Sequence, residues 1–442
     1  MKKTIELFIV LALLSVFIFL AKDKLAVFYY NRGNDYCERH LYKEAINYFN
    51  KSLKVNPSFA IVHYGLANAY LGERLEDRAI EEYKQVLQLD HRFAPGYKAL
   101  AHIYLRRELY QKAMDILKEA GTILPGSPEI GSLTNRAYLE YTVHLLDSGV
   151  DAFYRGDKLK AYELLKKTLQ VNPDYALSHY LLGYFYYFDN KYDESETALK
   201  EAIRLDDKFF FAYRLLGDIY FEKKNFNKAI EEYDSALTIN RNDVVILNNI
   251  GLAYMHLENY KQATSFLAEA SGLNAGNVNI RYNLASLYRD SGRLNEATSE
   301  YKNVINMQPG YPGVHNDLGD IYTQLGRKAE ASEEYRKEIR ICQDRIPPNP
   351  DDPFVLNNMS RAYNGIGEYN KAKELIDKAL SIKSDYQEAY LTLANICKNL
   401  GSPADELAAL KKAKGLSSQK YFFIEKNIGD IKEARILIDG KR

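Results

Sequence analysis

Side-chain amides are the most suggestive chemical feature of this chain, because asparagines recur regularly in its C-terminal half. Their spacing is about 34 residues, with one longer step. The set comprises Asn248, Asn249, Asn283, Asn316, Asn357 and Asn358. A carboxamide has one acceptor oxygen and two N–H donors, so it can pair with both polar groups of a peptide unit. A row of such amides could hold the backbone of an extended chain.

The residue types needed for other chemistry are not arranged in recognisable motifs. Cys37, Cys342 and Cys397 are far apart and form no Cys-x-x-Cys pair, which argues against a zinc knuckle and a disulfide framework. The sequence contains no Gly-rich phosphate loop, nucleophile elbow or paired-carboxylate site. We therefore expect no enzyme activity, metal or cofactor. Lys and Arg number 59, as do Asp and Glu, and this balance argues against a nucleic-acid partner.

The elements that must position the asparagines form an internal repeat, which begins at Ala26. Counted within each unit, the eighth position is small and the twentieth is Ala in most units. The eighth positions are Gly33, Ala67, Ala101, Gly149, Gly183, Gly217, Gly251, Ala285, Gly319, Ser360 and Ala394. Two small residues in one unit allow two helices to pack closely, and a fixed period of this length predicts a solenoid of helical hairpins.

Other positions mark packing contacts and the ends of the helices. The eleventh is mostly Tyr and the twenty-fourth is large and apolar or aromatic, so each can pack against the small residues. Glycines at the fifteenth position predict a left-handed turn between the two helices. These are Gly156, Gly292, Gly326, Gly367 and Gly401. Prolines at the thirty-second position predict the end of the second helix. These are Pro57, Pro125, Pro173 and Pro309.

This pattern resembles the tetratricopeptide repeat family over most of the chain. Trp is absent, and Tyr, Leu or His stands at the fourth position where the family often has Trp. The resemblance implies an all-α, right-handed superhelical solenoid of about eleven helix-turn-helix units. It also implies a non-catalytic scaffold that binds a peptide or a partner protein in a concave groove.

In this family the groove is lined by the first helix of each unit. The polar residues that the resemblance places there are the six asparagines together with Asp317, Asp320, Arg361 and Asn395. The aromatic residues that it places there include Tyr180, Tyr184, Tyr187 and Phe211. The asparagine row is similar to the asparagine-lined superhelix of O-linked N-acetylglucosamine transferases, which grips peptide backbone. For the asparagines, the alternative is that they bridge neighbouring helices. For the aromatic rings, the alternative is that they belong to the core.

The N-terminus has a different composition. An apolar run, broken only by Ser15, extends from Leu7 to Ala21 between flanking lysines, and residues 5–21 are predicted to enter a membrane. Phe19 does not suit a signal-peptide cleavage site, so we favour a retained single-pass anchor with an extracytoplasmic solenoid in a bacterial cell. The alternatives are a cleaved signal that leaves a secreted or periplasmic chain, and a solenoid that faces the cytoplasm.

Interruptions of the period divide the chain into blocks. We expect an anchor or signal at 1–24, units one to three at 25–127, and a long helix with units four to nine at 128–345. These blocks are followed by a Pro-rich break at 346–352, units ten and eleven at 353–420, and a capping helix at 421–442. Residues 129–154 are predicted to form one long helix or a broken one. The predicted function is a membrane-tethered scaffold, or else a targeting or regulatory subunit of a multi-protein enzyme or envelope-assembly complex, for example one concerned with glycosyl transfer or polysaccharide.

Overall fold

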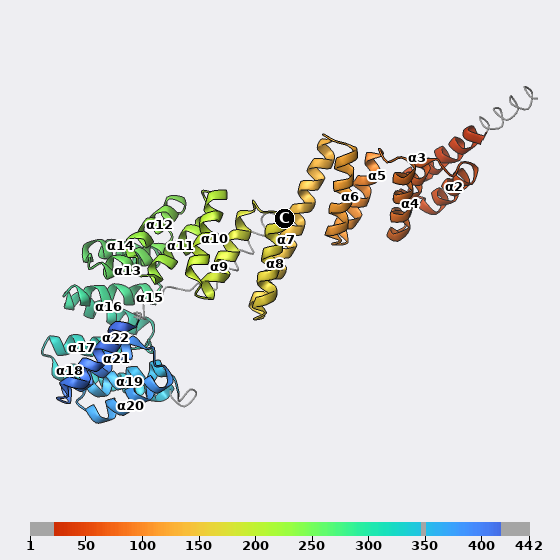
Figure 1. The fold of residues 1–442 in the computed structure, drawn as a ribbon. Helices are drawn as coiled ribbons and strands as arrows, with labels where there is room; N and C mark the ends of the chain where they lie inside the picture. Colours follow the sequence, from red (N-terminus) through yellow and green to blue (C-terminus); the bar gives the residue numbers. More distant parts are fainter. Residues whose placement is uncertain (1–21, 346–350, 417–442) are drawn as a thin grey trace, which may run out of the picture. The chain divides into compact units, whose positions relative to one another are not determined.

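The computed structural model describes residues 22–345 and 351–416, and this part of the chain is helical with no strand (Figure 1). The predicted anchor at 5–21 and capping helix at 421–442, as well as most of the Pro-rich break, lie outside the described residues. None of the described helices is both long enough and apolar enough to span a membrane. The chain divides into two compact units, with the boundary between Ser178 and His179. The blocks predicted from the interruptions stay a prediction.

The first unit consists of helical residues 22–38 followed by antiparallel hairpins. Its helices are α2 (Tyr42–Val55), α3 (Ala60–Gly72), α4 (Glu76–Leu89), α5 (Ala94–Arg106), α6 (Tyr110–Ile123), α7 (Pro128–Tyr154) and α8 (Lys158–Val171). Helix α7 is continuous over the whole predicted insertion. It begins at Pro128, where the Ser127 side chain accepts a hydrogen bond from the Ile130 backbone N–H.

Helix α9 (Ala176–Phe188) contains the boundary, and the second unit continues the same hairpins. Its further helices are α10 (Tyr192–Leu205), α11 (Phe210–Glu222), α12 (Phe226–Ile239), α13 (Val244–His256), α14 (Tyr260–Leu273), α15 (Val278–Asp290), α16 (Leu294–Met307), α17 (Val314–Gln324), α18 (Lys328–Arg345), α19 (Pro353–Gly365), α20 (Tyr369–Ile382), α21 (Gln387–Asn399) and α22 (Pro403–Gly415). The odd-numbered helices from α9 onward are the first helices of their repeats.

Close contact between small and large residues holds each hairpin together. A Cβ atom added at Gly217 would lie 2.5 Å from the ring of Tyr233 on the partner helix. The same addition at Gly319 would lie 2.6 Å from the ring of Tyr335. Distances this short leave no room for a side chain, so the predicted packing of the eighth against the twenty-fourth position is confirmed in these units.

The turn inside each hairpin follows one geometry whatever residue occupies it. The five predicted glycines have φ between 72° and 87°. The fifteenth position of the other six units is also left-handed, with φ from 56° to 60°, at His40, Arg74, Glu108, Asn190, Lys224 and Glu258. This conformation costs an L-residue roughly 1–2 kcal/mol. Packing of the two helices therefore imposes the turn even where the residue type disfavours it.

Candidate functional site

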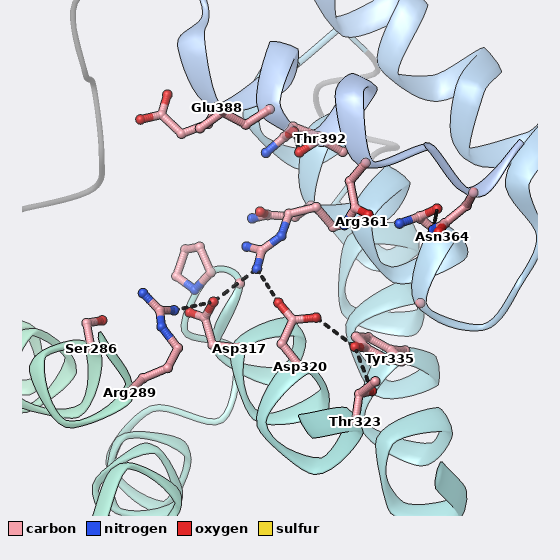
Figure 2. A pocket seen from close by; sticks show the side chains of 18 of the residues that line it. Ser286, Arg289, Asp317, Asp320, Thr323, Tyr335, Arg361, Asn364, Glu388 and Thr392 are labelled. Atoms are coloured by element: carbon pink, nitrogen blue, oxygen red, sulfur yellow. Dashed lines mark hydrogen bonds and ion pairs between the residues drawn. The ribbon is translucent and has the colours of Figure 1, made fainter. Parts of the chain in front are cut away.

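A cavity of about 640 Å³ lies in the second unit (Figure 2). Its walls come from four first helices, α15, α17, α19 and α21, with contributions from α18 and α20. Helix α17 contacts α19, and α19 contacts α21, because successive units stack on each other. A cavity of this size is in the range of small-molecule and peptide side-chain pockets, roughly 300–1,000 Å³.

Two carboxylates and two guanidinium groups form the floor of this pocket. Asp317 accepts hydrogen bonds from Arg289 and Arg361, both at 3.1 Å, and from the Tyr282 hydroxyl at 2.6 Å. Its side chain is only 3% exposed. Asp317 therefore joins three consecutive first helices, α15, α17 and α19. Figure 2 shows the two arginines on either side of it.

Asp320 lies one helical turn after Asp317 and faces the same pocket. It accepts a hydrogen bond from Arg361 at 2.9 Å and another from the Tyr335 hydroxyl at 2.6 Å. Its side chain is 45% exposed, so it lies nearer to solvent than Asp317. Arg361 thus donates from one nitrogen, Nη2, to both carboxylates.

The environment keeps Asp317 and Arg361 charged and the Tyr335 hydroxyl protonated. Burial acts to raise the pKa of Asp317, but the charges of Arg361 and Arg289 outweigh it, and the pKa is lowered overall. Burial acts to lower the pKa of Arg361, and the two carboxylates reverse this effect and raise it. Burial raises the pKa of Tyr335, so its hydroxyl stays protonated and can donate to Asp320.

The predicted asparagines fall into two groups. Asn357 and Asn358 line the pocket together with the predicted Asp320 and Arg361. Asn357 donates to the Tyr386 hydroxyl at 3.3 Å and accepts from Thr392 at 2.8 Å. The Asn358 side chain makes no hydrogen bond with any described residue.

All six asparagines are buried, and the other four are absent from the pocket lining. Asn283 donates to Asn248 at 2.9 Å, and Asn248 donates to Asn249 at 3.2 Å. Asn249 continues this path to Asp218 at 3.2 Å, so the amides connect α15, α13 and α11. The Asn316 amide donates to the backbone oxygen of Asn358 at 2.9 Å. These contacts match the alternative in which asparagines bridge neighbouring helices. Peptide binding by these four stays a prediction, and it would require the bridges to open.

The predicted aromatic residues lie among other rings. Tyr180, Tyr184 and Tyr187 are buried, and Phe211 is partly exposed. The ring centroids of Tyr180 and Phe211 are 6.2 Å apart. The centroids of Tyr184 and Phe188 are 4.7 Å apart. This arrangement matches the alternative of a packed aromatic cluster, and peptide anchoring by these rings stays a prediction.

Sequence reasoning missed several residues of the pocket. Arg289 occupies the twelfth position of its unit, and Glu388 the second position of its unit, which are both groove positions of the family. Counting every groove position of α15 and α21 would have found them. The same count finds Tyr282, which occupies the fifth position of its unit, whereas Tyr335 came without such a signal because it belongs to the packed twenty-fourth position.

A further rule became visible only in the structure. A Tyr at the twenty-fourth position donates to, or shares a hydrogen bond with, the polar residue at the ninth position of the same unit. The pairs are Tyr83 with Asn68, Tyr233 with Asp218, Tyr301 with Ser286, and Tyr335 with Asp320. A core hydroxyl therefore orients one polar residue of the inner face in each of these units.

Comparison with protein families identifies the repeats. Models described as tetratricopeptide repeat match residues 26–59, 146–208, 244–277, 312–345 and 355–386. A model described as TPR repeat matches residues 217–258 and 285–326. Together these matches span more than half of the chain, so it belongs to the tetratricopeptide repeat family. A search among curated proteins finds no match.

Solved structures with similar folds include yeast Tom70, at 17% identity and a TM-score of 0.42, covering 94% of this chain and 96% of that one. A tetratricopeptide repeat protein from Parabacteroides merdae matches at 20% identity and a TM-score of 0.48, covering 58% of this chain and 99% of that one. YrrB, titled a TPR protein with an unusual peptide-binding site, matches at 20% identity and a TM-score of 0.31, covering 51% and 95%. Similarities of this size carry no argument about function.

Proposed function

We propose that this chain is a non-catalytic scaffold that binds an extended segment of a partner protein in the pocket between α15 and α21. The observation that carries the proposal is the cavity of about 640 Å³, whose polar side chains come from four successive first helices. Packed helices lie roughly 8–10 Å apart, and an extended chain rises about 3.3 Å per residue. Each repeat therefore meets an extended chain about every third residue.

The chemistry of the lining supports binding rather than catalysis. Arginines and tyrosine hydroxyls already occupy the two carboxylates of the floor, which favours a structural role for them. Among the described residues, no group of three or more His, Cys, Asp or Glu side chains could hold a metal ion. The amides at the rim offer hydrogen bonds that suit a peptide backbone.

The test is capture of peptides by the immobilised full chain from a capped random peptide library, followed by mass spectrometry. We expect a retained set whose binding falls on the order of tenfold when Asn358 and Asn395 are both replaced by Ala, since each loses about 0.5–1.5 kcal/mol of hydrogen bonding. Asn34→Ala is the matched control, because Asn34 occupies the ninth position of the first repeat, outside the pocket. Equal loss in the control, or no retained peptide, would contradict the proposal.

The proposal includes a tether through residues 5–21, whose apolar sequence suits a membrane. Membrane fractionation of cells that express the full chain, with intact-mass analysis of the pellet, tests it. We expect residues 1–20 to be present in the membrane fraction. A soluble chain that begins near Lys22 would contradict the tether without affecting the binding proposal.

A further inference from the structure

The floor of the pocket has no surplus of positive charge. Arg289 and Arg361 contribute two positive charges, and Asp317 and Asp320 contribute two negative ones. Arg289 also donates through Nε to Asp290 at 2.9 Å. Both cations therefore already have carboxylate partners before any ligand enters.

The same arginines retain unused N–H groups. A guanidinium group has five N–H donors and no acceptor. Both hydrogen bonds of Arg361 leave from Nη2, so its Nε and Nη1 have no partner among the described residues. Arg289 donates from Nε and Nη1, and its Nη2 has no partner among the same residues. The floor thus has a surplus of donors without a surplus of positive charge.

Amides at the rim add to this surplus. The side chains of Asn358 and Asn395 line the pocket and make no hydrogen bond within the described chain. Asn364 accepts a hydrogen bond from Asn399 at 3.0 Å through its oxygen, which leaves its own NH2 group available. A ligand that fits these groups must supply acceptors.

From these observations we infer that the pocket selects neutral, carbonyl-rich peptide segments and discriminates against acidic ones. This inference rests on the proposed function. The acceptors would be backbone carbonyls and the side-chain carbonyls of Asn and Gln. They can take the spare N–H groups without disturbing the existing ion pairs.

An acidic segment meets an electrostatic obstacle. Its carboxylate would compete with Asp317 and Asp320 for the same two arginines. Asp317 is almost fully buried, and a buried carboxylate that loses its partners is strongly destabilising. A further carboxylate would also lie close to two others of the same charge. A neutral carbonyl avoids both effects.

The test uses two pools of short synthetic peptides, acetylated and amidated at their ends. One pool is neutral and rich in Asn, Gln, Ser and Gly, and in the other several of these residues are replaced by Glu. We expect the full chain to retain the neutral pool on the order of tenfold better, which is the ratio produced by one modest charge–charge term. Binding of the neutral pool should change little with salt, since no net charge is paired.

Two variants alter the charge of the pocket in place. Asp320→Asn removes one carboxylate and keeps one oxygen, which can accept from Tyr335 or from Arg361, because these two donors now bind different oxygens of Asp320. Asn395→Lys adds a positive charge at an exposed position on the rim. Each should raise retention of the acidic pool relative to the neutral pool by several-fold. Asn34→Lys in the first repeat is the matched control and should leave the ratio unchanged.

The outcomes separate this inference from the proposed function. Retention of peptides with no preference for the neutral pool, or a preference that neither variant changes, overturns the inference and leaves the scaffold proposal intact. Retention of neither pool by any form of the chain overturns both. Circular dichroism of each variant verifies the fold, and the exposed position of Asn395 makes Asn395→Lys informative even if Asp320→Asn unfolds.

Discussion

The asparagines of α13 and α15 and those of α19 occupy equivalent repeat positions but have different surroundings. Asn248, Asn249 and Asn283 hydrogen-bond to one another and are buried. Asn357 and Asn358 are buried as well, but they line a cavity. The comparison teaches that a repeat position defines which direction a side chain takes, while the neighbouring units decide whether it meets another amide or an open pocket.

The ion pairs on the pocket floor should show the largest effect on stability. Arg361→Ala leaves buried Asp317 without one of its two cations, and breaking a buried pair costs about 3–5 kcal/mol. Because the Arg361 side chain is 31% exposed, we expect the lower end of this range, about 3 kcal/mol. Urea unfolding with hydrogen exchange should locate the loss in α15 to α21.

The control for this prediction is a surface pair. Arg107 donates to Asp77 at 2.7 Å, but the Asp77 side chain is 86% exposed. Arg107→Ala should therefore change the free energy of unfolding by less than about 1 kcal/mol. Similar losses for the two variants would show that the pocket floor is no more important for stability than the surface.

Amides that bridge helices and amides that line the pocket should respond differently to truncation. Asn283→Ala removes a buried donor and leaves the Asn248 oxygen without it, which should cost about 1–3 kcal/mol of stability. Asn358→Ala should cost less stability than Asn283→Ala, because its side chain makes no hydrogen bond with a described residue, and it should instead weaken peptide binding. Thermal melts of both variants measure stability, and peptide capture by both variants measures binding. A destabilised Asn358→Ala with normal binding would erase the distinction.

Asp317 and His63 should lose their contributions to stability in opposite directions of pH. The pKa of Asp317 is lowered in the folded state. Its contribution to stability is therefore present above the pKa of the unfolded state, about 3.9, and is lost as the pH falls through the pKa of the folded state. The hydrogen bond with Glu82, 2.6 Å from His63 Nδ1, raises the pKa of His63. The contribution of His63 to stability is present below about pH 6.5 and is lost as the pH rises through the pKa of His63 in the folded state.

Hydrogen exchange across a pH series should therefore show α17 weakening in acid, below about pH 4, and α3 and α4 weakening above about pH 6.5. His63→Gln is the control for the second effect, because it removes the titrating group and should abolish the loss at higher pH. Weakening of α3 and α4 in the opposite direction would contradict the assignment.

The smallest expected effect concerns the hairpin turns of the same two regions. The turns after α15, α17 and α19 use Gly292, Gly326 and Gly367, whereas the turn after α13 uses Glu258 with φ of 56°. Glu258→Gly removes left-handed strain of roughly 1–2 kcal/mol but adds flexibility to the unfolded chain, so we expect a gain of no more than about 1 kcal/mol. Gly326→Ala should lose a similar amount in urea unfolding. A loss in Glu258→Gly would show that its side chain contributes more than the strain costs.

Particular residues show how far the sequence could be followed. The period predicted the left-handed turns at Gly156 and Gly292, because glycine is the residue that adopts this conformation without strain. It did not predict the same turn at Lys224 or Glu258, whose residue types disfavour it. There the close packing of two helices overrides local preference.

The candidate site divides in the same way. Asp320, Asn357, Asn358 and Arg361 could be assigned to the inner face from their repeat positions alone, and the structure brings them to one pocket. The sequence left open whether the amides bridge or line a groove, since hydrogen bonds such as Asn283 to Asn248 join different repeats. The role of Tyr335 as a donor to Asp320 was likewise invisible, because it depends on how a core ring lies.

The sequence by itself determined the repeat, its helical hairpins and the face on which each polar side chain lies, because these follow from periodicity and from the sizes of residues within one unit. Only the tertiary structure decided which amides are consumed in bridges, how Asp317 joins α15 to α19, and where a cavity remains open. The physical reason is that these properties depend on distances between atoms of different repeats. Those distances are set by packing across unit boundaries, which no single unit encodes.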